Sequence, residues 1–267
     1  MAHIALTIAG SDSGGGAGIQ ADLKAMSALG IYGASVITAV TAQNTRAVTA
    51  MHGIPLDIVT AQIAAVLGDL DVGAIKIGML ATPETIETVA DAIVGFNGPI
   101  VLDPVMIAKS GDALLAQDAV ATLRDVLLPR ATVLTPNLPE AARLLDQLEA
   151  ASAAEMVAQG RALVDLGAQA VVMKGGHAKG DTCHDILISD SCVLAEFTAP
   201  RYQTNNTHGT GCTLSSSITA GLAKGLPLEQ AVGQAHEYLQ GAIGAADDLD
   251  VGHGHGPVHH FHRFWQA

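Results

Sequence analysis

Short apolar runs alternate with longer amphipathic segments along the whole chain. The apolar runs predict strands at residues 4–9, 34–40, 74–77, 100–102, 132–134, 170–173, 185–188 and 193–197. Helical periodicity predicts helices at residues 19–29, 55–69, 83–94, 113–127, 139–148, 153–166, 212–224 and 228–246. Strands that are apolar throughout and alternate with helices are typical of a mostly parallel sheet with helices on both faces. The pattern therefore predicts an α/β fold.

Residues 185–197 depart from this alternation. Two short strands there flank the turn formers Ser189, Asp190 and Ser191, which predicts an antiparallel hairpin. The chain shows no internal repeat and no linker rich in proline or serine. Because 267 residues suffice for one large core, we expect residues 1–267 to form a single domain.

The balance of charge limits the class of partner. Lys and Arg together number 13 and Asp and Glu number 26, which gives a net charge of −13 with histidine neutral. A protein that binds nucleic acid needs a basic face to displace counterions from the phosphates. We therefore expect no nucleic-acid partner.

The sequence also predicts a cytoplasmic protein without a membrane segment. The first residues lack the basic and apolar regions of a signal peptide. The longest uncharged stretch, residues 25–45, is interrupted by glycines and polar residues. Cys183, Cys192 and Cys212 are odd in number and form no CxxC motif, which favours reduced thiols.

A glycine-rich loop at residues 10–18 joins the first predicted strand to the first predicted helix. It contains neither a GxGxxG motif nor a P-loop, so two interpretations stay open: a tight turn, or a loop that lets a ligand approach the backbone. Asp22 follows in the helix, where complementing the helix dipole is the simplest role for a carboxylate.

Polar residues follow three further strands, at the edge of the sheet where open parallel sheets bind ligands. Asn137 and Glu140 have the spacing of a capping box, and Glu140 could also hold Mg²⁺ through water; the four residues alone favour the cap. Asp103 ends an apolar strand with no cap to serve, which makes it a candidate for a cation or phosphate site. Lys174, before two glycines, is a weaker candidate for a phosphate contact.

The strongest chemical signal is Gly209, Thr210 and Gly211 directly before Cys212 and an apolar helix. Unpaired N–H groups at such a helix start form an anion hole. A helix N-terminus lowers the pKa of a thiol, so we expect Cys212 to act as a base or to orient a substrate hydroxyl rather than to be inert core.

Histidines are concentrated near the C-terminus. Five of the eleven lie at positions 253, 255, 259, 260 and 262, which permits a metal-binding tract. No cysteine or acidic residue is interleaved there, and Phe261, Phe264 and Trp265 are typical packing anchors. Packing is therefore favoured over a metal site.

Taken together, eight segments resemble the ribokinase-like superfamily, and within it the hydroxymethylpyrimidine/phosphomethylpyrimidine kinase family. The segments are residues 8–22, 38–44, 76–80, 102–106, 135–140, 174–177, 208–213 and 254–260. The resemblance extends over essentially the whole chain, and the order of the motifs makes it specific. One position departs from the wider superfamily: Cys212 stands where most sugar kinases carry an aspartate base, although cysteine is usual in the pyrimidine-kinase branch.

The resemblance implies a three-layer α/β/α fold with a mostly parallel sheet and no large lid insertion. It implies ATP and Mg²⁺ as cofactors and a small pyrimidine as substrate, phosphorylated first on its hydroxymethyl group and then on the resulting phosphate. It also implies a homodimer. Two alternatives stay open: a pyridoxal or pyridoxine kinase of the same superfamily, and a non-catalytic sensor that binds the pyrimidine.

The resemblance also assigns roles to individual residues. The implied pyrimidine site consists of Gly10, Asp22, Gln43, Met79 and Val105. The implied ATP and Mg²⁺ site consists of Asp103, Asn137, Glu140, Lys174 and Thr210, with Mg²⁺ near Asp103 and Glu140. The implied catalytic residues are Lys174, Gly209, Thr210, Gly211 and Cys212.

Overall fold

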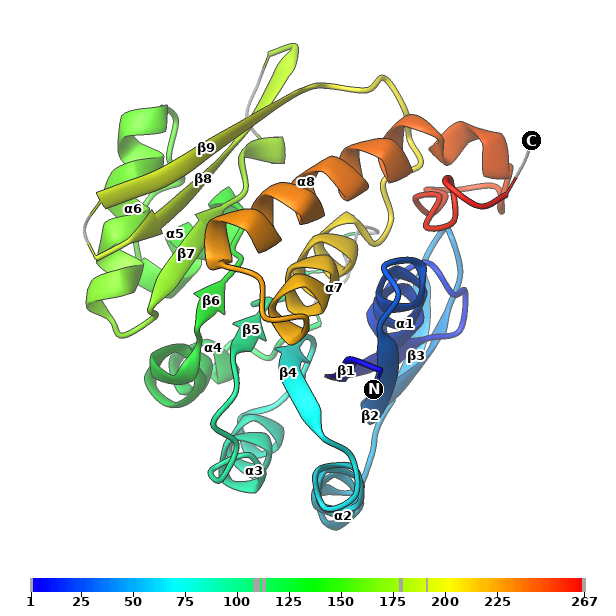
Figure 1. Ribbon diagram of the computed structural model, residues 1–267, viewed down its shortest axis with the longest axis vertical. Coiled ribbons are helices and arrows are strands. Elements are labelled where there is room, and N and C mark those ends of the chain that lie inside the picture. Colours follow the sequence, from blue (N-terminus) through cyan, green and yellow to red (C-terminus); the bar gives the residue numbers. More distant parts are fainter. Residues whose placement is uncertain (1, 108–110, 112–113, 178–179, 191, 266–267) are drawn as a thin grey trace.

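A twisted nine-stranded sheet forms the centre of the computed structural model, which describes residues 2–107, 111, 114–177, 180–190 and 192–265 (Figure 1). Within these residues the strand order is β3-β2-β1-β4-β5-β6-β7-β8-β9. The strands are β1 Ile4–Asp12, β2 Tyr32–Gln43, β3 Val48–Gly53, β4 Val72–Ile77, β5 Ile100–Leu102, β6 Val133–Leu134, β7 Ala170–Met173, β8 Thr182–Ser189 and β9 Cys192–Pro200. Neighbours from β2 to β7 pair in parallel, whereas β3, β8 and β9 pair antiparallel at the two edges.

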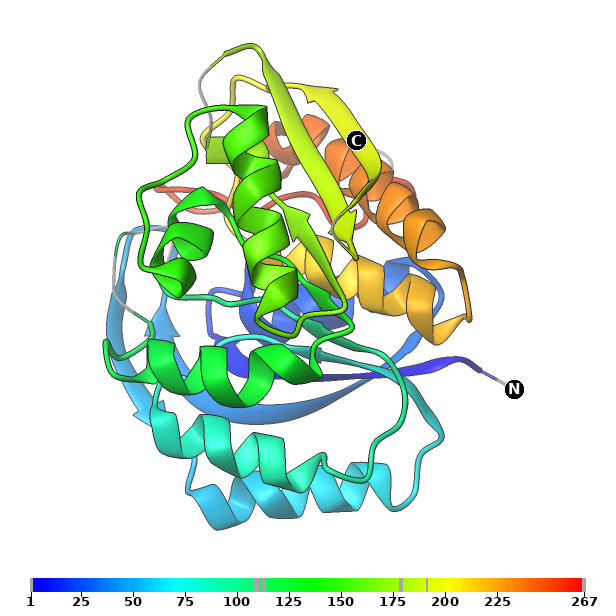
Figure 2. The same ribbon diagram turned by 90° about the vertical axis from the view of Figure 1, so that its left-hand side faces the viewer.

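Helices cover both faces of the sheet, which confirms the predicted three-layer α/β/α arrangement (Figures 1 and 2). They are α1 Gly18–Ala28, α2 Leu56–Leu67, α3 Pro83–Ala92, α4 Ala119–Thr122, α5 Leu138–Leu145, α6 Ala153–Asp165, α7 Thr210–Ala223 and α8 Leu228–Gly244. The helices α1, α7 and α8 lie on one face, and α2 to α6 lie on the other (Figure 2). Among the described residues, no helix has both the length and the apolarity needed to cross a membrane.

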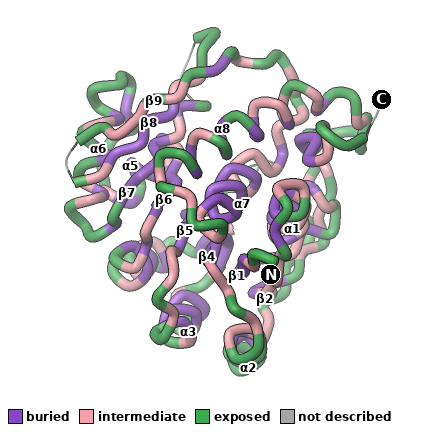
Figure 3. The backbone as a smooth tube through the Cα atoms, in the orientation of Figure 1, coloured by how far each residue is buried: buried purple, intermediate pink, exposed green. Residues whose placement is uncertain are grey.

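Alternation of side chains within single strands builds a core on each face. In β5, Ile100 and Leu102 belong to the core under α2 to α6, whereas Val101 belongs to the core under α7 and α8. Successive strand residues point to opposite faces, so a short strand must be apolar at every position when helices cover both. The central strands and α7 are accordingly buried along most of their length (Figure 3).

The structure corrects several predicted boundaries. The edge strand β3 was not predicted, because most of its residues are exposed and its sequence lacks a buried pattern. The helix expected at residues 113–127 begins instead at Ala119 and continues as a π-helical turn, Leu123–Leu127; its expected first residue lies outside the described residues. The helix expected to reach residue 148 ends at Leu145, because Asp146 adopts a left-handed conformation with φ 54°. The hairpin near residue 190 is confirmed, with longer strands than predicted.

Candidate active site

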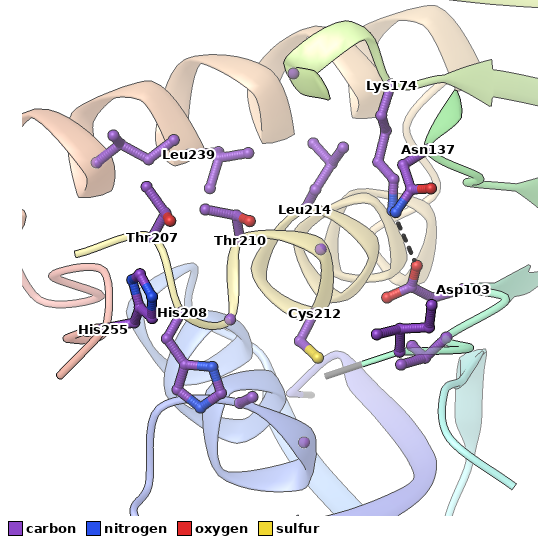
Figure 4. Close-up of a pocket in the computed structure, with 18 of the residues that line it drawn as sticks. Asp103, Asn137, Lys174, Thr207, His208, Thr210, Cys212, Leu214, Leu239 and His255 are labelled. Carbon is purple, nitrogen blue, oxygen red and sulfur yellow. Dashed lines mark hydrogen bonds and ion pairs between the residues drawn. The ribbon is translucent and has the colours of Figure 1, made fainter. Parts of the chain in front are cut away.

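A cavity of about 990 Å³ opens at the carboxyl ends of the parallel strands. It is lined by the loops after β1, β2, β4, β5, β6 and β7 and by the first turn of α7. Every predicted site residue except Asp22 lines it. In the view of Figure 4, Cys212 lies between His208 on one side and the ion pair of Lys174 with Asp103 on the other.

Asp12 organises the glycine-rich loop. Its carboxylate accepts hydrogen bonds from the backbone N–H groups of Gly14, Gly16 and Ala17 at 2.8, 3.1 and 2.8 Å. Its Oδ2 also lies 2.8 Å from Nε2 of His208, in the segment that precedes α7. The loop is a tight turn that Asp12 fixes, and its residues Gly10, Ala17 and Gly18 line the cavity, so the structure agrees with both interpretations of the loop.

Gly209 starts α7 in a conformation that requires glycine. Its φ is 83°, and a Cβ there would collide with the carbonyl oxygen of Gly16. The helix then begins at Thr210, whose N–H donates to the Thr207 carbonyl at 3.4 Å, and its first turn lines the cavity with the positive end of the helix dipole. The structure thus places Gly209, Thr210 and Gly211 at the cavity, and the anion hole stays a prediction.

Cys212 lies in this first turn, but the prediction of a lowered thiol pKa is wrong. Burial raises the pKa of Cys212 to about 12, and it outweighs the opposing effects of Lys76 and of a hydrogen bond from the Gly18 N–H. The nearby carboxylates of Asp22 and Asp103 raise the pKa further. The thiol is therefore protonated at neutral pH, and the helix dipole does not decide its state.

Asp22 lies one layer below the cavity, in an ion pair that is fully buried. Its Oδ2 accepts hydrogen bonds from Oγ1 of Thr7 at 2.6 Å and from Nζ of Lys76 at 2.8 Å. Asp22 and Lys76 both have 0% exposed side chains. Burial lowers the pKa of Lys76, but Asp22, together with Cys212 and Asp103, reverses this effect and raises the pKa above its usual range. Asp22 therefore supports Lys76, which lines the cavity.

Lys174 forms a cationic corner of the cavity with two carboxylates. Its Nζ lies 3.2 Å from Oδ1 of Asp103 and 3.8 Å from Oε2 of Glu140. Thr135 and Ser215 each donate a further hydrogen bond to Asp103, at 3.2 Å. Burial raises the pKa of Asp103, but Lys174 and then Lys76 reverse this effect and hold it below its usual range. Asp103 is therefore an ionised carboxylate beside a cation.

Asn137 and Glu140 form the predicted capping box at the start of α5. Oδ1 of Asn137 accepts from the Glu140 N–H at 2.9 Å, and Oε2 of Glu140 accepts from the Asn137 N–H at 2.8 Å. Burial raises the pKa of Glu140 to about 7, against the opposing effect of Lys174. Asn137 and Glu140 thus cap α5, and Glu140 at the same time lies beside Lys174 at the cationic corner.

A less polar wall of the cavity includes Gly10, Met79 and Val105, together with Gln43. A Cβ at Gly10 would collide with the Met79 side chain, so glycine lets this methionine cover the backbone of β1. The amide of Gln43 accepts a hydrogen bond from Thr41 at 3.1 Å, and its nitrogen lies 3.3 Å from the His208 ring. This wall can offer a flat apolar surface beside one amide.

Lys76 and the pair of Asp12 with His208 line the cavity but were not predicted as functional residues. A signal for Lys76 was present, because a lysine inside an otherwise apolar strand must have a buried partner. The partnership of Asp12 with His208 joins residues 196 positions apart, and no local pattern indicates it.

The histidine-rich C-terminal region packs against the protein. The rings of Phe261 and Trp265 stack with centroids 5.3 Å apart, and His259 lies 5.3 Å from the Trp265 ring. Within the part of the chain that the structure describes, no group of three or more His, Cys, Asp or Glu side chains is placed to hold a metal ion. Phe264 and Trp265 are nevertheless 62% and 58% exposed, so the prediction that they anchor this region by packing is wrong. Val258, His259 and His260 are the buried residues of the region instead.

A protein-family model described as phosphomethylpyrimidine kinase matches residues 12–259, which include both walls of the cavity and the start of α7. The chain belongs to the phosphomethylpyrimidine kinase family. A hydroxymethylpyrimidine/phosphomethylpyrimidine kinase of Rhizobium meliloti (strain 1021) is 58% identical over 266 residues, which cover 100% of both chains.

Two solved structures share the fold of this kinase. A Bacillus subtilis pyridoxal kinase in complex with ADP has a TM-score of 0.91 and 36% identity, covering 100% of both chains. A phosphomethylpyrimidine kinase of Clostridium difficile 630 has a TM-score of 0.79 and 42% identity, covering 90% of this chain and 99% of that one. The same fold thus occurs in kinases for two kinds of small aromatic substrate.

Proposed function

We propose that this enzyme uses ATP to phosphorylate 4-amino-5-hydroxymethyl-2-methylpyrimidine, first on its hydroxymethyl group and then on the resulting phosphate, in thiamin synthesis. The observation that carries the proposal is one continuous cavity with an apolar wall beside Gln43 and a cationic corner at Lys174. An amide offers a donor and an acceptor to an aminopyrimidine edge, and a lysine offers a point charge to a phosphate. Family membership supports both assignments.

The chain's residues would act mainly by positioning and by neutralising charge. Transfer forms a bond between the alcohol oxygen and the γ-phosphorus, breaks the bond from that phosphorus to the bridging oxygen of ADP and releases the alcohol proton to water. The transition state is loose and needs little help from a base, so the start of α7 and Lys174 would supply the main stabilisation. Because the Cys212 thiol is protonated at neutral pH, we propose that it orients the hydroxyl.

The proposed role of Cys212 makes a kinetic prediction. Cys212→Ala is expected to lose more in kcat than in pyrimidine affinity, because an orienting contact matters most in the transition state. Steady-state kinetics and a direct binding measurement on the same preparation would separate the two. A collapse of affinity with intact turnover contradicts the role.

The carboxylates of the cationic corner fit Mg²⁺. Asp103 and Glu140 offer only oxygen ligands, and Asp103 is held ionised, as this cation prefers. Asp103 would be the stronger contact, because Oε2 of Glu140 is engaged in the capping box. When bound, Mg²⁺ would neutralise negative charge on the phosphates of ATP.

The decisive experiment is incubation of the protein with Mg²⁺, ATP and the hydroxymethylpyrimidine, followed by mass spectrometry of the products. We expect the monophosphate to appear first and the diphosphate to follow, with ADP formed at each step. Lys174→Met is the matched control, because it removes the cation while keeping a similar chain length. Consumption of ATP without phosphorylated pyrimidine, or no binding of nucleotide, would instead support the non-catalytic sensor.

Pyridoxal is the second candidate substrate, because a pyridoxal kinase shares this fold at 36% identity. Its ring also carries a hydroxymethyl group, so the same wall could accept it. Measurement of kcat/KM for both substrates side by side tests the choice. A large preference for pyridoxal would overturn the assignment to the pyrimidine.

We propose a homodimer that forms through the edge of the sheet at β3. This strand ends the sheet, and Met51 on it and Val40 on β2 are 46% and 42% exposed. An exposed edge strand is a template for pairing with a second chain. Light scattering should give twice the mass of the chain, and Met51→Glu should lower it. A monomer at all concentrations contradicts this proposal.

We also propose a cytoplasmic location. Cys183, Cys192 and Cys212 are free thiols in the structure. Unpaired cysteines favour a reducing compartment, because oxidising ones promote disulfides. Fractionation of cells that express the tagged chain would test the proposal.

A further inference from the structure

Residues 253–260 are here named the C-terminal strap, and His255 within it lines the cavity. The His208 N–H donates to the Gly256 carbonyl at 3.0 Å, and the Val258 N–H donates to the His208 carbonyl at 3.3 Å. Further back, the His255 N–H donates to the carbonyl of Thr45, just after β2, at 2.8 Å. Figure 1 shows this red segment between the end of α8 and the blue β2 and β3. The strap therefore connects the two walls of the cavity.

The end of the strap is fixed by α8. The Tyr238 hydroxyl donates to the His260 carbonyl at 2.6 Å, and the His259 N–H donates to the Ala242 carbonyl at 2.9 Å. The side chains of His260 and Tyr238 are buried, with 4% and 1% exposure of these residues. With its backbone held on both sides, the His260 ring has a defined position.

The His260 ring reaches the start of α7 through one hydroxyl group. Its Nε2 lies 3.0 Å from Oγ1 of Thr213, and this Oγ1 lies 2.8 Å from the Gly209 carbonyl oxygen. A carbonyl only accepts, so the single hydroxyl proton of Thr213 must point to Gly209. His260 must then carry its proton on Nε2 and donate it to Thr213. Burial lowers the pKa of His260 to about 3, so the ring is neutral at physiological pH and this chain of hydrogen bonds persists.

The orientation of the Gly209 carbonyl sets the direction in which the N–H groups of the anion hole point. This carbonyl also accepts from the Thr213 N–H at 2.8 Å, so both donors of Thr213 hold it. In a planar trans peptide, the Thr210 N–H points opposite to the Gly209 carbonyl. The Thr210 N–H donates to the Thr207 carbonyl at 3.4 Å, so fixing this plane fixes the entry into α7 and thereby the direction of the N–H groups that follow in its first turn. The left-handed φ of Gly209 makes the restraint necessary, because glycine has wide conformational freedom.

We propose that His260 is a positioning residue for phosphoryl transfer: through Thr213 it holds the Gly209 carbonyl and so aligns the N–H groups of the anion hole. The expected effect on kcat rests on the proposed function. The expected effect on hydrogen exchange at the start of α7 rests on this geometry alone. The C-terminal histidines thereby acquire a role in the site without binding a metal ion.

Two pairs of variants test the proposal. His260→Leu removes the donor, and His260→Gln keeps an N–H donor at a similar reach. Thr213→Val removes the hydroxyl without changing the shape of the side chain, and Thr213→Ser keeps it. For each variant we would measure kcat, both KM values, the thermal midpoint and hydrogen exchange of the amides at residues 208–214.

We expect His260→Leu and Thr213→Val to lower kcat about 10-fold, which corresponds to the loss of one hydrogen bond. The pyrimidine KM should change by less than about 2-fold, because the substrate contacts remain. Hydrogen exchange at the start of α7 should become faster in these two variants. His260→Gln and Thr213→Ser should stay within about 3-fold of the parent kcat.

Unchanged kcat and unchanged exchange in folded His260→Leu and Thr213→Val would overturn the proposal. An equal loss in His260→Gln and His260→Leu that follows the thermal midpoint would also overturn it, because the role would then be purely structural. If the parent enzyme does not phosphorylate the pyrimidine, the proposed function fails. The exchange comparison then decides the positioning role by itself.

Discussion

The ion pairs of Lys76 with Asp22 and of Lys174 with Asp103 lie in different surroundings, which suit them to different roles. The side chains of Lys76 and Asp22 have 0% exposure, so their charges act mainly on neighbours such as Cys212. The Lys174 side chain keeps 13% exposure, so its ammonium can reach a ligand while Asp103 holds it in place. The pair of Lys76 with Asp22 therefore supports the cavity from below, whereas the pair of Lys174 with Asp103 leaves an ammonium group that a ligand can reach.

Removal of one member of the enclosed pair should strongly destabilise the fold. Lys76→Met leaves the Asp22 charge buried without its partner, which should lower the free energy of unfolding by about 3–5 kcal/mol. The double variant Lys76→Met with Asp22→Leu should recover most of this loss, because no unpaired charge remains. Urea unfolding of the parent, both single variants and the double variant forms a double-mutant cycle. If the two single losses in the free energy of unfolding simply add in the double variant, Lys76 and Asp22 are not direct partners.

The raised pKa of Cys212 predicts slow alkylation. The thiolate is the reactive form, so iodoacetamide should label Cys212 much more slowly at neutral pH than the exposed Cys192. Peptide mapping by mass spectrometry compares the two in one sample, with Cys192 as the internal control. Rapid labelling of Cys212 before Cys192 would show that its thiol is activated.

Single elements show where sequence patterns succeed and where they fail. The strands β5 and β7 are predicted well, because both of their faces are covered and every position must be apolar. The edge strand β3 escapes prediction, because backbone pairing with β2 stabilises it while its side chains stay mostly exposed. The start of α7 is predicted from Gly209 and Gly211, although its restraint by His260 is not.

The start of α7 should tolerate no side chain at position 209. Gly209→Ala combines a left-handed φ with a collision against Gly16, so we expect a loss of more than about 2 kcal/mol in stability and a marked fall in kcat/KM. Gly30→Ala is the matched control, since φ there is 74° but the space is open. It should cost only about 1 kcal/mol, with activity unchanged. Equal effects of the two substitutions would mean that the contact with Gly16 is unimportant.

At the scale of the whole molecule, the cavity unites residues from both ends of the chain. The acidic composition is compatible with the proposed binding of polyanionic ATP, because Lys174 and the start of α7 would set the local potential in the cavity. A net charge of −13 is a property of the whole chain, and it limits which macromolecules bind the protein. It says nothing about the sign of the potential inside the cavity.

The ionisation of Glu140 should make the free energy of unfolding depend on pH. Its folded pKa of about 7 lies above the ordinary value of 4.5, so the folded state holds this proton more tightly than the unfolded state does. The resulting stabilisation is complete below the ordinary pKa and is lost as the pH rises through about 7.

Glu140→Gln should remove this contribution. The free energy of unfolding of the parent, minus that of Glu140→Gln, should therefore fall mostly between about pH 4.5 and pH 7 and level off above this range. Urea unfolding across this range measures the difference, and Glu155→Gln is a control in the first turn of α6. Parallel curves for the parent and Glu140→Gln would contradict the raised pKa.

The sequence by itself determined the layered α/β fold, the strands buried on both faces and the motifs that indicate the kinase family. These follow from local patterns, because periodicity, capping and glycine requirements act over a few neighbouring residues. Tertiary structure decided the protonation of Cys212, the enclosure of Asp22 with Lys76 and the contact of His260 with Thr213. Burial and electrostatic effects depend on groups that are distant in the sequence, so they exist only once the chain is folded.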